Sequence, residues 1–371
     1  MPTRLFVATR KGLFRFERRF GRRWSAPHVR FLGDCVTALL PDARSGTLYA
    51  ARERRDSGVQ LQRSADAGER FEACATPSFP RPEAGEAPEG SGGAGRAPRV
   101  ARVWSLAAGD PADPGQLWAG TMPGALFVSR DAAQSWQLVE SLWKRPEREA
   151  WTGDGCDQPG IHSICVDPRD ARHLTVGVSV GGVWVTRDGG ESWTCQAKGM
   201  RADYLPPELC LNPNLQDPHR IVQCAAQPDV LWAQHHSGVY VSRDAGASWT
   251  AVQNVPPSTF GYAVAVHPRK PNTAWFAPAV TDACRVPVDA RPVVSRTTNG
   301  GKSFRILRRG LPEPPAYDLV YRHALAVDAS GRRLALGSTT GGLWISENGG
   351  RSWSGIPCRL PPIYAIRFER E

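Results

Sequence analysis

The sequence predicts an all-β fold assembled from repeated units, and three observations support this prediction. A short motif recurs six times along the 371 residues, and a glycine-led apolar strand precedes most of the copies. Glycine and proline are abundant, with 37 and 32 residues, as expected where many short strands need many turns. Hydrophobic residues make up 41% of the chain, which is enough to bury a core.

The recurring motif reads Ser/Thr–x–Asp/Asn–x–Gly–x–Ser/Thr–Trp/Phe. Asp or Asn can cap the backbone N–H groups of a tight turn, and glycine supplies a positive φ. The aromatic residue anchors the following strand in the core. Two copies depart at one position each, since Arg70 replaces the second hydroxyl residue and Ala133 replaces the glycine. The copies span 64–71, 129–136, 186–193, 242–249, 297–304 and 346–353.

This motif resembles the Asp-box, or BNR repeat, of sialidase-like β-propellers, and its six copies extend the resemblance over nearly the whole chain. The resemblance implies blades of four antiparallel strands, with each box in the hairpin between the third and fourth strands. It also implies a structural role for the box aspartates, to which we assign no catalytic function. Ligand sites of the family lie over the central channel, on the face opposite the boxes.

Seven blades are expected in a single domain that covers residues 1–371. A degenerate seventh unit fits at 12–24, and the first unit lacks an inner strand before Thr3. The chain has a spare strand at 363–368, which we expect to complete the first blade and close the ring. The alternative is a six-bladed ring with a decorated terminus.

Four segments interrupt the repeats. Residues 79–101 are rich in Pro, Gly, Ala and Glu, so we expect a flexible insertion between two blades. The insertions at 141–160, 200–219 and 278–294 contain aromatic and charged residues. They are typical of ordered loops that can form the wall of a pocket, which favours a small-molecule ligand over a large partner.

Charge and cysteine usage narrow the function class. The net charge is +10, but the arginines are spread along the chain without a basic block, so we expect no specific nucleic-acid partner. The nine cysteines include no C-x-x-C pair, which argues against a disulfide framework or a structural zinc site. No apolar run is long enough for a membrane helix, and the N-terminus does not resemble a secretory signal. We therefore expect a soluble, cytoplasmic protein without a membrane partner.

The starts of the inner strands supply the candidate site. Five of the eight histidines map to this end of the ring or beside it: His162, His219, His235, His236 and His323. Converging imidazoles suit a divalent transition metal such as Zn, Fe, Cu or Ni, and they also suit acid–base catalysis near neutral pH. We predict a metal bound by His162, His235 and His323, with His219 and His236 as reserve ligands. The first position of each inner strand, in our alignment, is Tyr364, Cys35, Ser105, His162, Val222, Tyr262 or His323.

Other residues near the same strand starts fit a substrate. We predict catalytic roles for Tyr262, Tyr364 and Arg322, and substrate binding by Arg10, Trp104, Arg220 and Asp282. A metal-free pocket would instead use the arginines on an anionic ligand and the aromatic rings on its apolar part. The favoured function is a metal-dependent enzyme that acts on a small polar or anionic substrate.

Two alternatives stay open. Sialidases of the Asp-box superfamily use three arginines to bind a carboxylate and a tyrosine nucleophile, and this chain has candidates for both. It lacks the early F/Y-R-I-P segment of that family, and seven blades differ from the sialidase six. A non-catalytic scaffold, similar to the photosystem assembly factor, is the second alternative. The sequence carries no sign of the oligomeric state.

Overall fold

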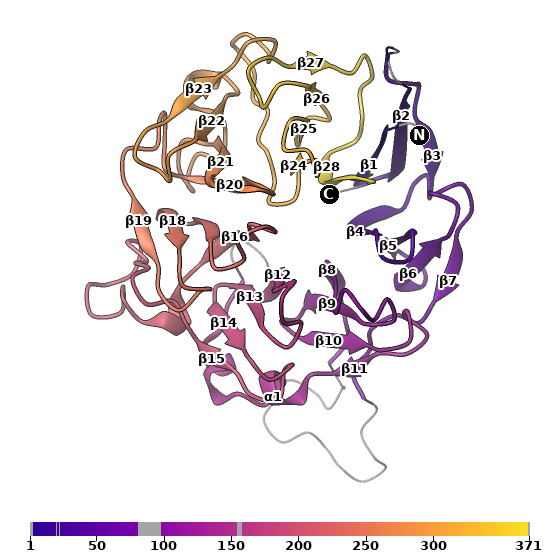
Figure 1. The fold of residues 1–371 in the computed structure, drawn as a ribbon, viewed down its shortest axis with the longest axis vertical. Helices are drawn as coiled ribbons and strands as arrows, with labels where there is room; N and C mark the ends of the chain where they lie inside the picture. Colours follow the sequence, from indigo (N-terminus) through magenta and orange to yellow (C-terminus); the bar gives the residue numbers. More distant parts are fainter. Residues whose placement is uncertain (1–2, 20, 22, 81–97, 154–157, 370–371) are drawn as a thin grey trace.

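The computed structural model describes residues 3–19, 21, 23–80, 98–153 and 158–369. Seven four-stranded antiparallel sheets form a ring around one axis, which is a seven-bladed β-propeller (Figure 1). The predicted fold class is confirmed, and the six-bladed alternative is wrong. Most of the predicted insertion at 79–101 lies outside the described residues.

Each blade contains an inner strand, two middle strands and an outer strand. Blade 1 is β28 (Ile363–Phe368), β1 (Thr3–Thr9), β2 (Gly12–Arg18) and β3 (His28–Arg30); blade 2 is β4 (Cys35–Asp42), β5 (Thr47–Arg54), β6 (Gly58–Ser64) and β7 (Glu72–Cys74); blade 3 is β8 (Arg102–Ala108), β9 (Leu117–Met122), β10 (Leu126–Ser129) and β11 (Gln137–Leu138); blade 4 is β12 (Gly160–Val166), β13 (Leu174–Ser179), β14 (Gly182–Thr186) and β15 (Thr194–Cys195). Blade 5 is β16 (Pro218–Gln223), β17 (Leu231–His235), β18 (Gly238–Ser242) and β19 (Thr250–Val252); blade 6 is β20 (Gly261–His267), β21 (Lys270–Pro278), β22 (Val294–Thr297) and β23 (Arg305–Leu307); blade 7 is β24 (Leu325–Val327), β25 (Leu334–Gly337), β26 (Leu343–Ser346) and β27 (Ser354–Gly355).

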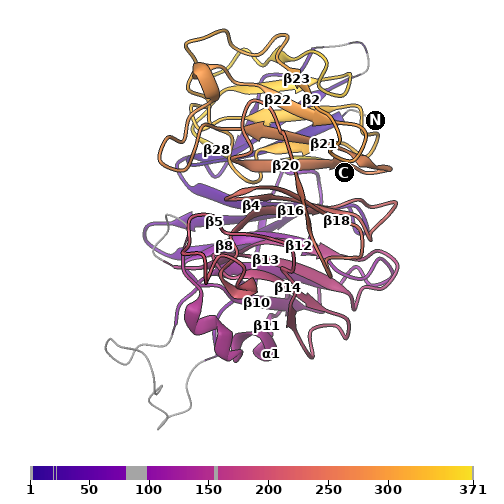
Figure 2. The same cartoon turned by 90° about the vertical axis from the view of Figure 1, so that its left-hand side faces the viewer.

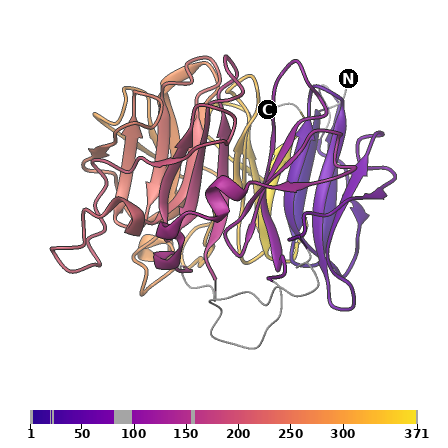
Figure 3. The ribbon, with the colours of Figure 1, turned by 90° about the horizontal axis from the view of Figure 1, so that it is seen from below.

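Helical turns are few and short. They are α1 (Glu140–Trp143) and the 3-10 turns η1 (Pro146–Ala150), η2 (Pro213–Leu215) and η3 (Val288–Ala290). Two of the long loops pack on each other, because Trp151 Nε1 donates to Asn214 Oδ1 at 2.9 Å and Asn214 Nδ2 donates to the Glu147 carbonyl at 2.7 Å. Views from two sides show the strands running from one face of the disc to the other, so that loops gather on both faces (Figure 2, Figure 3). No helix in the described part of the chain is long and apolar enough to cross a membrane.

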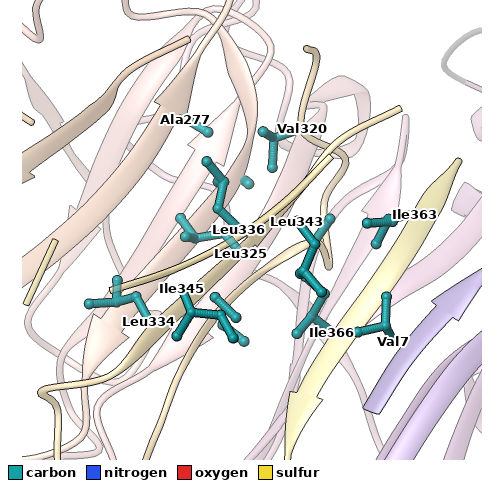
Figure 4. Close-up of a cluster of buried hydrophobic side chains, with 14 of the residues drawn as sticks. Val7, Ala277, Val320, Leu325, Leu334, Leu336, Leu343, Ile345, Ile363 and Ile366 are labelled. Carbon is teal, nitrogen blue, oxygen red and sulfur yellow. The ribbon is translucent and has the colours of Figure 1, made fainter. Parts of the chain in front are cut away.

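The C-terminal strand closes the ring, as predicted. β28 pairs antiparallel with β1, and Ile366 lies opposite Val7 in the ladder. Both side chains are fully buried in a cluster that joins blades 7 and 1, together with Leu325, Leu343 and Ile345 (Figure 4). The first blade therefore combines the two ends of the described chain, and neither β1 nor β28 leaves an open sheet edge at this junction.

The six motif copies form the same turn. In the copy at 186–193, Thr186 Oγ1 donates to Asp188 Oδ1 and accepts a hydrogen bond from the Gly190 backbone N–H. Ser192 Oγ donates to the other carboxylate oxygen of Asp188 at 2.5 Å. Gly190 has φ +97°, a conformation that glycine adopts without strain. Equivalent hydroxyl-to-backbone bonds occur at Ser64, Ser129, Ser242, Thr297 and Ser346.

The two departures from the motif are accommodated locally. Arg70 replaces the second hydroxyl, and its Nε donates to Asp66 Oδ2 at 2.9 Å, so the carboxylate keeps its second partner. Ala133 replaces the glycine and retains the positive φ, at +66°. Where Asn replaces Asp, the direction of one bond reverses, since Asn299 Nδ2 donates to Ser303 Oγ. The motif thus requires a side-chain oxygen at the Asp/Asn position as an acceptor. The residue four positions later contacts that side chain, and it can be serine or arginine.

Two of the motif tryptophans tie their blade to the preceding one by a hydrogen bond. Trp136 Nε1 of blade 3 donates to the Ala75 carbonyl just beyond β7, and Trp249 Nε1 of blade 5 donates to the Gln196 carbonyl just beyond β15. Trp193, Trp249 and Trp353 are each 4% exposed, so these rings fill the space between blades. Burying a ring of this size contributes on the order of 2–3 kcal/mol per residue.

Candidate functional site

The inner strands share an irregularity that positions the site. In each of β4, β8, β12, β16, β20 and β28 the pairing with the neighbouring strand skips one residue. Such a bulge bends the strand and re-aims the extra side chain. In blade 7, His323 precedes the short β24 and forms an isolated bridge to Ala365. The seven residues, one from each blade, are Tyr364, Thr37, Trp104, His162, His219, Tyr262 and His323.

Five of these seven residues line a pocket of about 410 Å³ at the ring axis. A volume of this size matches a small-molecule site. Side chains from five blades reach it, so the ring geometry and not a local motif assembles the pocket. The lining residues are Thr37, Arg102, Trp104, Tyr262, Arg285, Leu319, Tyr321, Arg322, His323 and Tyr364.

Three arginines and four large aromatic rings dominate this lining. The Arg322 guanidinium lies 5.1 Å from the ring centroids of both Trp104 and Tyr262, within the range of cation–π attraction. Arg285 lies 5.9 Å from the Tyr262 ring. The rings of Tyr321 and Tyr364 contact each other, with centroids 5.8 Å apart. The pocket thus offers cationic groups set against flat apolar surfaces.

Carboxylates lie behind the arginines. Glu53 accepts from Arg102 Nε at 2.5 Å and from Arg102 Nη2 at 3.2 Å. Burial alone would lower the pKa of Arg102, but its hydrogen bonds and attraction to Glu53 raise the pKa instead. Asp282 forms an ion pair with Arg285. Among the described residues that line the pocket there is no Asp or Glu.

Two of the predicted metal ligands are linked through a backbone group. His323 Nε2 donates to the His162 carbonyl at 2.8 Å, and Arg220 Nη1 donates to the same oxygen at 3.1 Å. The His162 ring packs edge-on against Trp104, and its Nδ1 lies 2.9 Å from Ser163 Oγ. Burial, with the nearby charges of Arg322 and Arg220, holds the pKa of His162 well below its usual range.

His235 lies in a different environment from the other two. Its Nε2 faces the Asp217 backbone N–H and its Nδ1 faces the Ser237 backbone N–H, each at 3.0 Å. Burial lowers the pKa of His235 to about 3. Metal binding by His162, His235 and His323 therefore stays a prediction, and the structure does not place their ring nitrogens around one point in the described part of the chain.

A different group of side chains has metal-ligand spacing. Asp217, His219 and His236 each offer one ligand atom, and these atoms lie within 4.8 Å of one another. Asp217 Oδ2 is 3.4 Å from His219 Nε2 and 3.3 Å from His236 Nδ1. The His219 ring stacks on Tyr262, with centroids 4.5 Å apart, so this group adjoins the pocket. Burial alone would raise the pKa of Asp217, but His219, His236 and Arg322 outweigh it and hold the pKa well below its usual range.

The predicted substrate and catalytic residues divide into two sets. Tyr262, Tyr364, Arg322 and Trp104 line the pocket, as does the predicted ligand His323. The remaining predicted residues lie outside the lining: Arg220 contacts His162, Asp282 pairs with Arg285, and Arg10 is an exposed residue whose backbone N–H donates to Pro362.

Sequence reasoning missed several residues of the site. Thr37, Arg285 and Leu319 line the pocket, and Asp217 belongs to the group beside it. The alignment placed Cys35, Ser105 and Val222 at strand starts where the bulges select Thr37, Trp104 and His219. A signal for Asp217 exists, because Asp–x–His at the start of a strand places two ligand side chains two residues apart.

Comparisons with known proteins agree with the fold. No family model matches the chain. Over 286 residues the chain is 26% identical to the oligoxyloglucan-reducing end-specific xyloglucanase of Emericella nidulans, a match that covers 70% of this chain and 33% of that enzyme. The chain thus spans about a third of the length of that relative.

Two solved structures extend the comparison. An ancestral GH74 enzyme superposes with a TM-score of 0.56 at 16% identity, over 90% of this chain and 38% of that one. YCF48 bound to D1 peptide superposes with a TM-score of 0.52 at 13% identity, over 87% and 82%. These likenesses establish a β-propeller fold. They leave the activity to be derived from the site.

Proposed function

We propose that the axial pocket binds a small carbohydrate that bears an anionic group, and that the protein is a glycoside hydrolase. The single observation that carries this proposal is the set of three arginines and four aromatic rings in one cavity of about 410 Å³. We also propose that the six motif turns are Asp-boxes.

The charge distribution favours an anionic ligand. Arg322 lies close to two aromatic rings, and Arg102 and Arg285 lie in the same lining. Guanidinium groups bind carboxylates and phosphates through paired, charge-assisted hydrogen bonds. Glu53 and Asp282 form ion pairs with Arg102 and Arg285, and neither carboxylate is among the described residues that line the pocket.

The aromatic rings and the sequence relative support the carbohydrate class. Trp104, Tyr262, Tyr321 and Tyr364 offer flat apolar surfaces with polar edges, which suit the mixed polarity of a sugar ring. The 26% identical relative is named a xyloglucanase. Binding of a neutral glucan does not need three arginines. We therefore propose that this chain is specific for a sugar with a negative charge.

The reaction class is constrained by the lining. Most glycosidases use two carboxyl groups about 5–9.5 Å apart, whereas sialidases use a tyrosine nucleophile. The described pocket residues include three tyrosines and no carboxylate, so the tyrosine version fits better. Burial and the nearby Cys35 raise the pKa of Tyr364, so this phenol requires a base to act as a nucleophile.

Calorimetric titration with sialic acid, glucuronic acid, a hexose phosphate and a neutral xyloglucan oligosaccharide tests the proposal. We expect binding of at least one anionic sugar and a loss of about tenfold or more in affinity for Arg322→Gln. Arg243→Gln is the matched control, because Arg243 is exposed and pairs with Asn272 outside the pocket. Binding of the neutral oligosaccharide alone, unaffected by Arg322→Gln, would contradict an anionic ligand.

A further inference from the structure

We propose that Asp217, His219 and His236 bind a divalent transition metal ion next to the axial pocket. This site differs from the trio predicted from the sequence, and it stands whether or not the pocket binds a charged sugar. One ligand precedes the inner strand β16, one lies at its bulge, and one follows β17, so the first hairpin of blade 5 supplies all three.

The distances between the ligand atoms match a bound ion. Two ligands at a tetrahedral angle, each about 2.0–2.1 Å from the metal, lie about 3.4 Å apart. The observed separations from Asp217 Oδ2 are 3.4 Å to His219 Nε2 and 3.3 Å to His236 Nδ1. Charge-assisted hydrogen bonds between nitrogen and a carboxylate are shorter, about 2.7–2.9 Å. The spacing is therefore wide for direct hydrogen bonding and suitable for an ion between the groups.

The rings are oriented as metal ligands usually are. His219 Nδ1 lies 2.6 Å from the Gly261 carbonyl, so Nδ1 carries a proton, and in the neutral ring Nε2 is then the nitrogen that can bind a metal on the Asp217 side. Ligating histidines in proteins commonly donate their second ring N–H to a carbonyl in this way. The backbone fixes the other two ligands, because the His236 N–H donates to the Asp217 carbonyl at 2.9 Å.

Burial makes an ion more favourable at this position. The side chains of Asp217 and His219 are 1% and 0% exposed, and that of His236 is 16% exposed. Within the described structure, Asp217 Oδ1 and His236 Nδ1 are buried and receive no hydrogen bond. Leaving buried polar atoms unsatisfied is costly, and a cation shared by one carboxylate and two neutral imidazoles removes that cost.

The ligand types select the class of ion. Two imidazole nitrogens and one carboxylate oxygen suit Zn, Fe, Co, Ni or Cu, whereas Mg and Ca prefer oxygen ligands alone. Three protein ligands leave at least one coordination position for water or another small ligand. Because Tyr262 stacks on His219 and also lines the pocket, an ion here would be separated from the pocket by one aromatic ring.

Metal titration of tag-free, chelator-treated protein tests the site without any activity assay. We expect about one equivalent of Zn²⁺ or Co²⁺ to bind, and bound Co²⁺ to show the visible absorption of a low-coordinate nitrogen and oxygen site. Asp217→Asn and His236→Gln should each weaken binding by about tenfold to a hundredfold. The matched control is His173→Gln, since His173 Nδ1 lies 3.6 Å from Asp167 in a pair that has no third ligand among the described residues.

Two results would contradict the proposed metal site. Equal Zn²⁺ affinity in the unmutated protein, Asp217→Asn and His236→Gln would overturn the proposal, as would the absence of a Co²⁺ spectrum. Circular dichroism and thermal unfolding check that each variant folds. If Asp217→Asn does not fold, His236→Gln carries the test, because its side chain reaches the surface and its loss disturbs less of the core.

Discussion

His323 donates a hydrogen bond from Nε2 to the backbone carbonyl of His162, 2.8 Å away, although the two residues belong to blades 7 and 4. Both side chains are buried. The bond links two blades that are not neighbours in the ring, and Arg220 reinforces it by donating to the same oxygen. A single peptide carbonyl therefore connects side chains from blades 5 and 7 to the backbone of blade 4.

Removing this link should destabilise the fold. We expect His323→Ala to lower the free energy of unfolding by about 1–3 kcal/mol, because a buried ring and a hydrogen bond are lost while Arg220 still satisfies the carbonyl. Urea unfolding measures the change. His28→Ala is the control, since His28 is exposed on the outer strand of blade 1. A loss below about 0.5 kcal/mol would mean that the cross-ring bond is not important for stability.

Stability should also fall in mild acid. Burial and two arginines hold the pKa of His162 well below the value of about 6.5 found in an unfolded chain. Below about pH 6.5 this histidine binds a proton in the unfolded chain but not in the folded protein. The stability that the neutral His162 ring contributes is therefore complete above about pH 6.5 and is lost as the pH falls. One histidine changes the unfolding free energy by at most about 1.4 kcal/mol per pH unit. Denaturant unfolding between pH 5 and 8 checks this prediction. The free energy of unfolding should change less steeply with pH in His162→Gln than in the unmutated protein.

In the motif turn at 186–193, the stability of the protein should depend on an acceptor oxygen at Asp188. Asp188 accepts hydrogen bonds from two hydroxyls and from the backbone N–H groups of Glu191 and Ser192. Asp188→Ala should cost about 1–2 kcal/mol of stability, whereas Asp188→Asn should cost less than about 0.5 kcal/mol. The difference arises because Asn keeps the acceptor oxygen and donates to the serine, as Asn348 does to Ser352. Equal losses in thermal or urea unfolding would show that the carboxylate charge matters more than its geometry.

The proposed reaction depends on a phenol in the pocket. If Tyr364 is the nucleophile, Tyr364→Phe should reduce kcat on an aryl glycoside of an anionic sugar by about a hundredfold or more. Ligand affinity should change by less than about threefold, because the ring that contacts the ligand remains. Tyr321→Phe is the comparison, since the Tyr321 ring contacts Tyr364 in the same lining. If Tyr364→Phe turned over substrate as fast as the unmutated protein, Tyr364 would not be the nucleophile.

The sequence predicted the architecture because the information for it is local. Each motif copy encodes its own turn, and an aromatic residue such as Trp136 or Trp193 marks the start of the strand that follows. Six copies and one degenerate unit at 12–24 therefore predicted the seven blades. Closure by residues 363–368 followed from one missing inner strand. Arg70 and Ala133 did not disturb the prediction, since their turns have the same shape as the others.

The site was predicted less completely because it depends on register. An alignment of regular strands assumes alternation, and one extra residue in six of the seven inner strands reverses which side chain faces the axis. His162 and Tyr262 were placed correctly, whereas the alignment chose residues two positions from Thr37 and three positions from His219. Arg285 comes from a loop, and no periodic pattern specifies the path of a loop.

The pairing of β28 with β1 also sets an order of events in time. During synthesis, β1 emerges before β28, and the strands of six further blades leave the ribosome between them. Throughout that interval one side of β1 offers unpaired backbone groups, which are a template for pairing with other chains. Blade 1 is thus completed only when β28 has been made, and until then its β1 edge is open to aggregation.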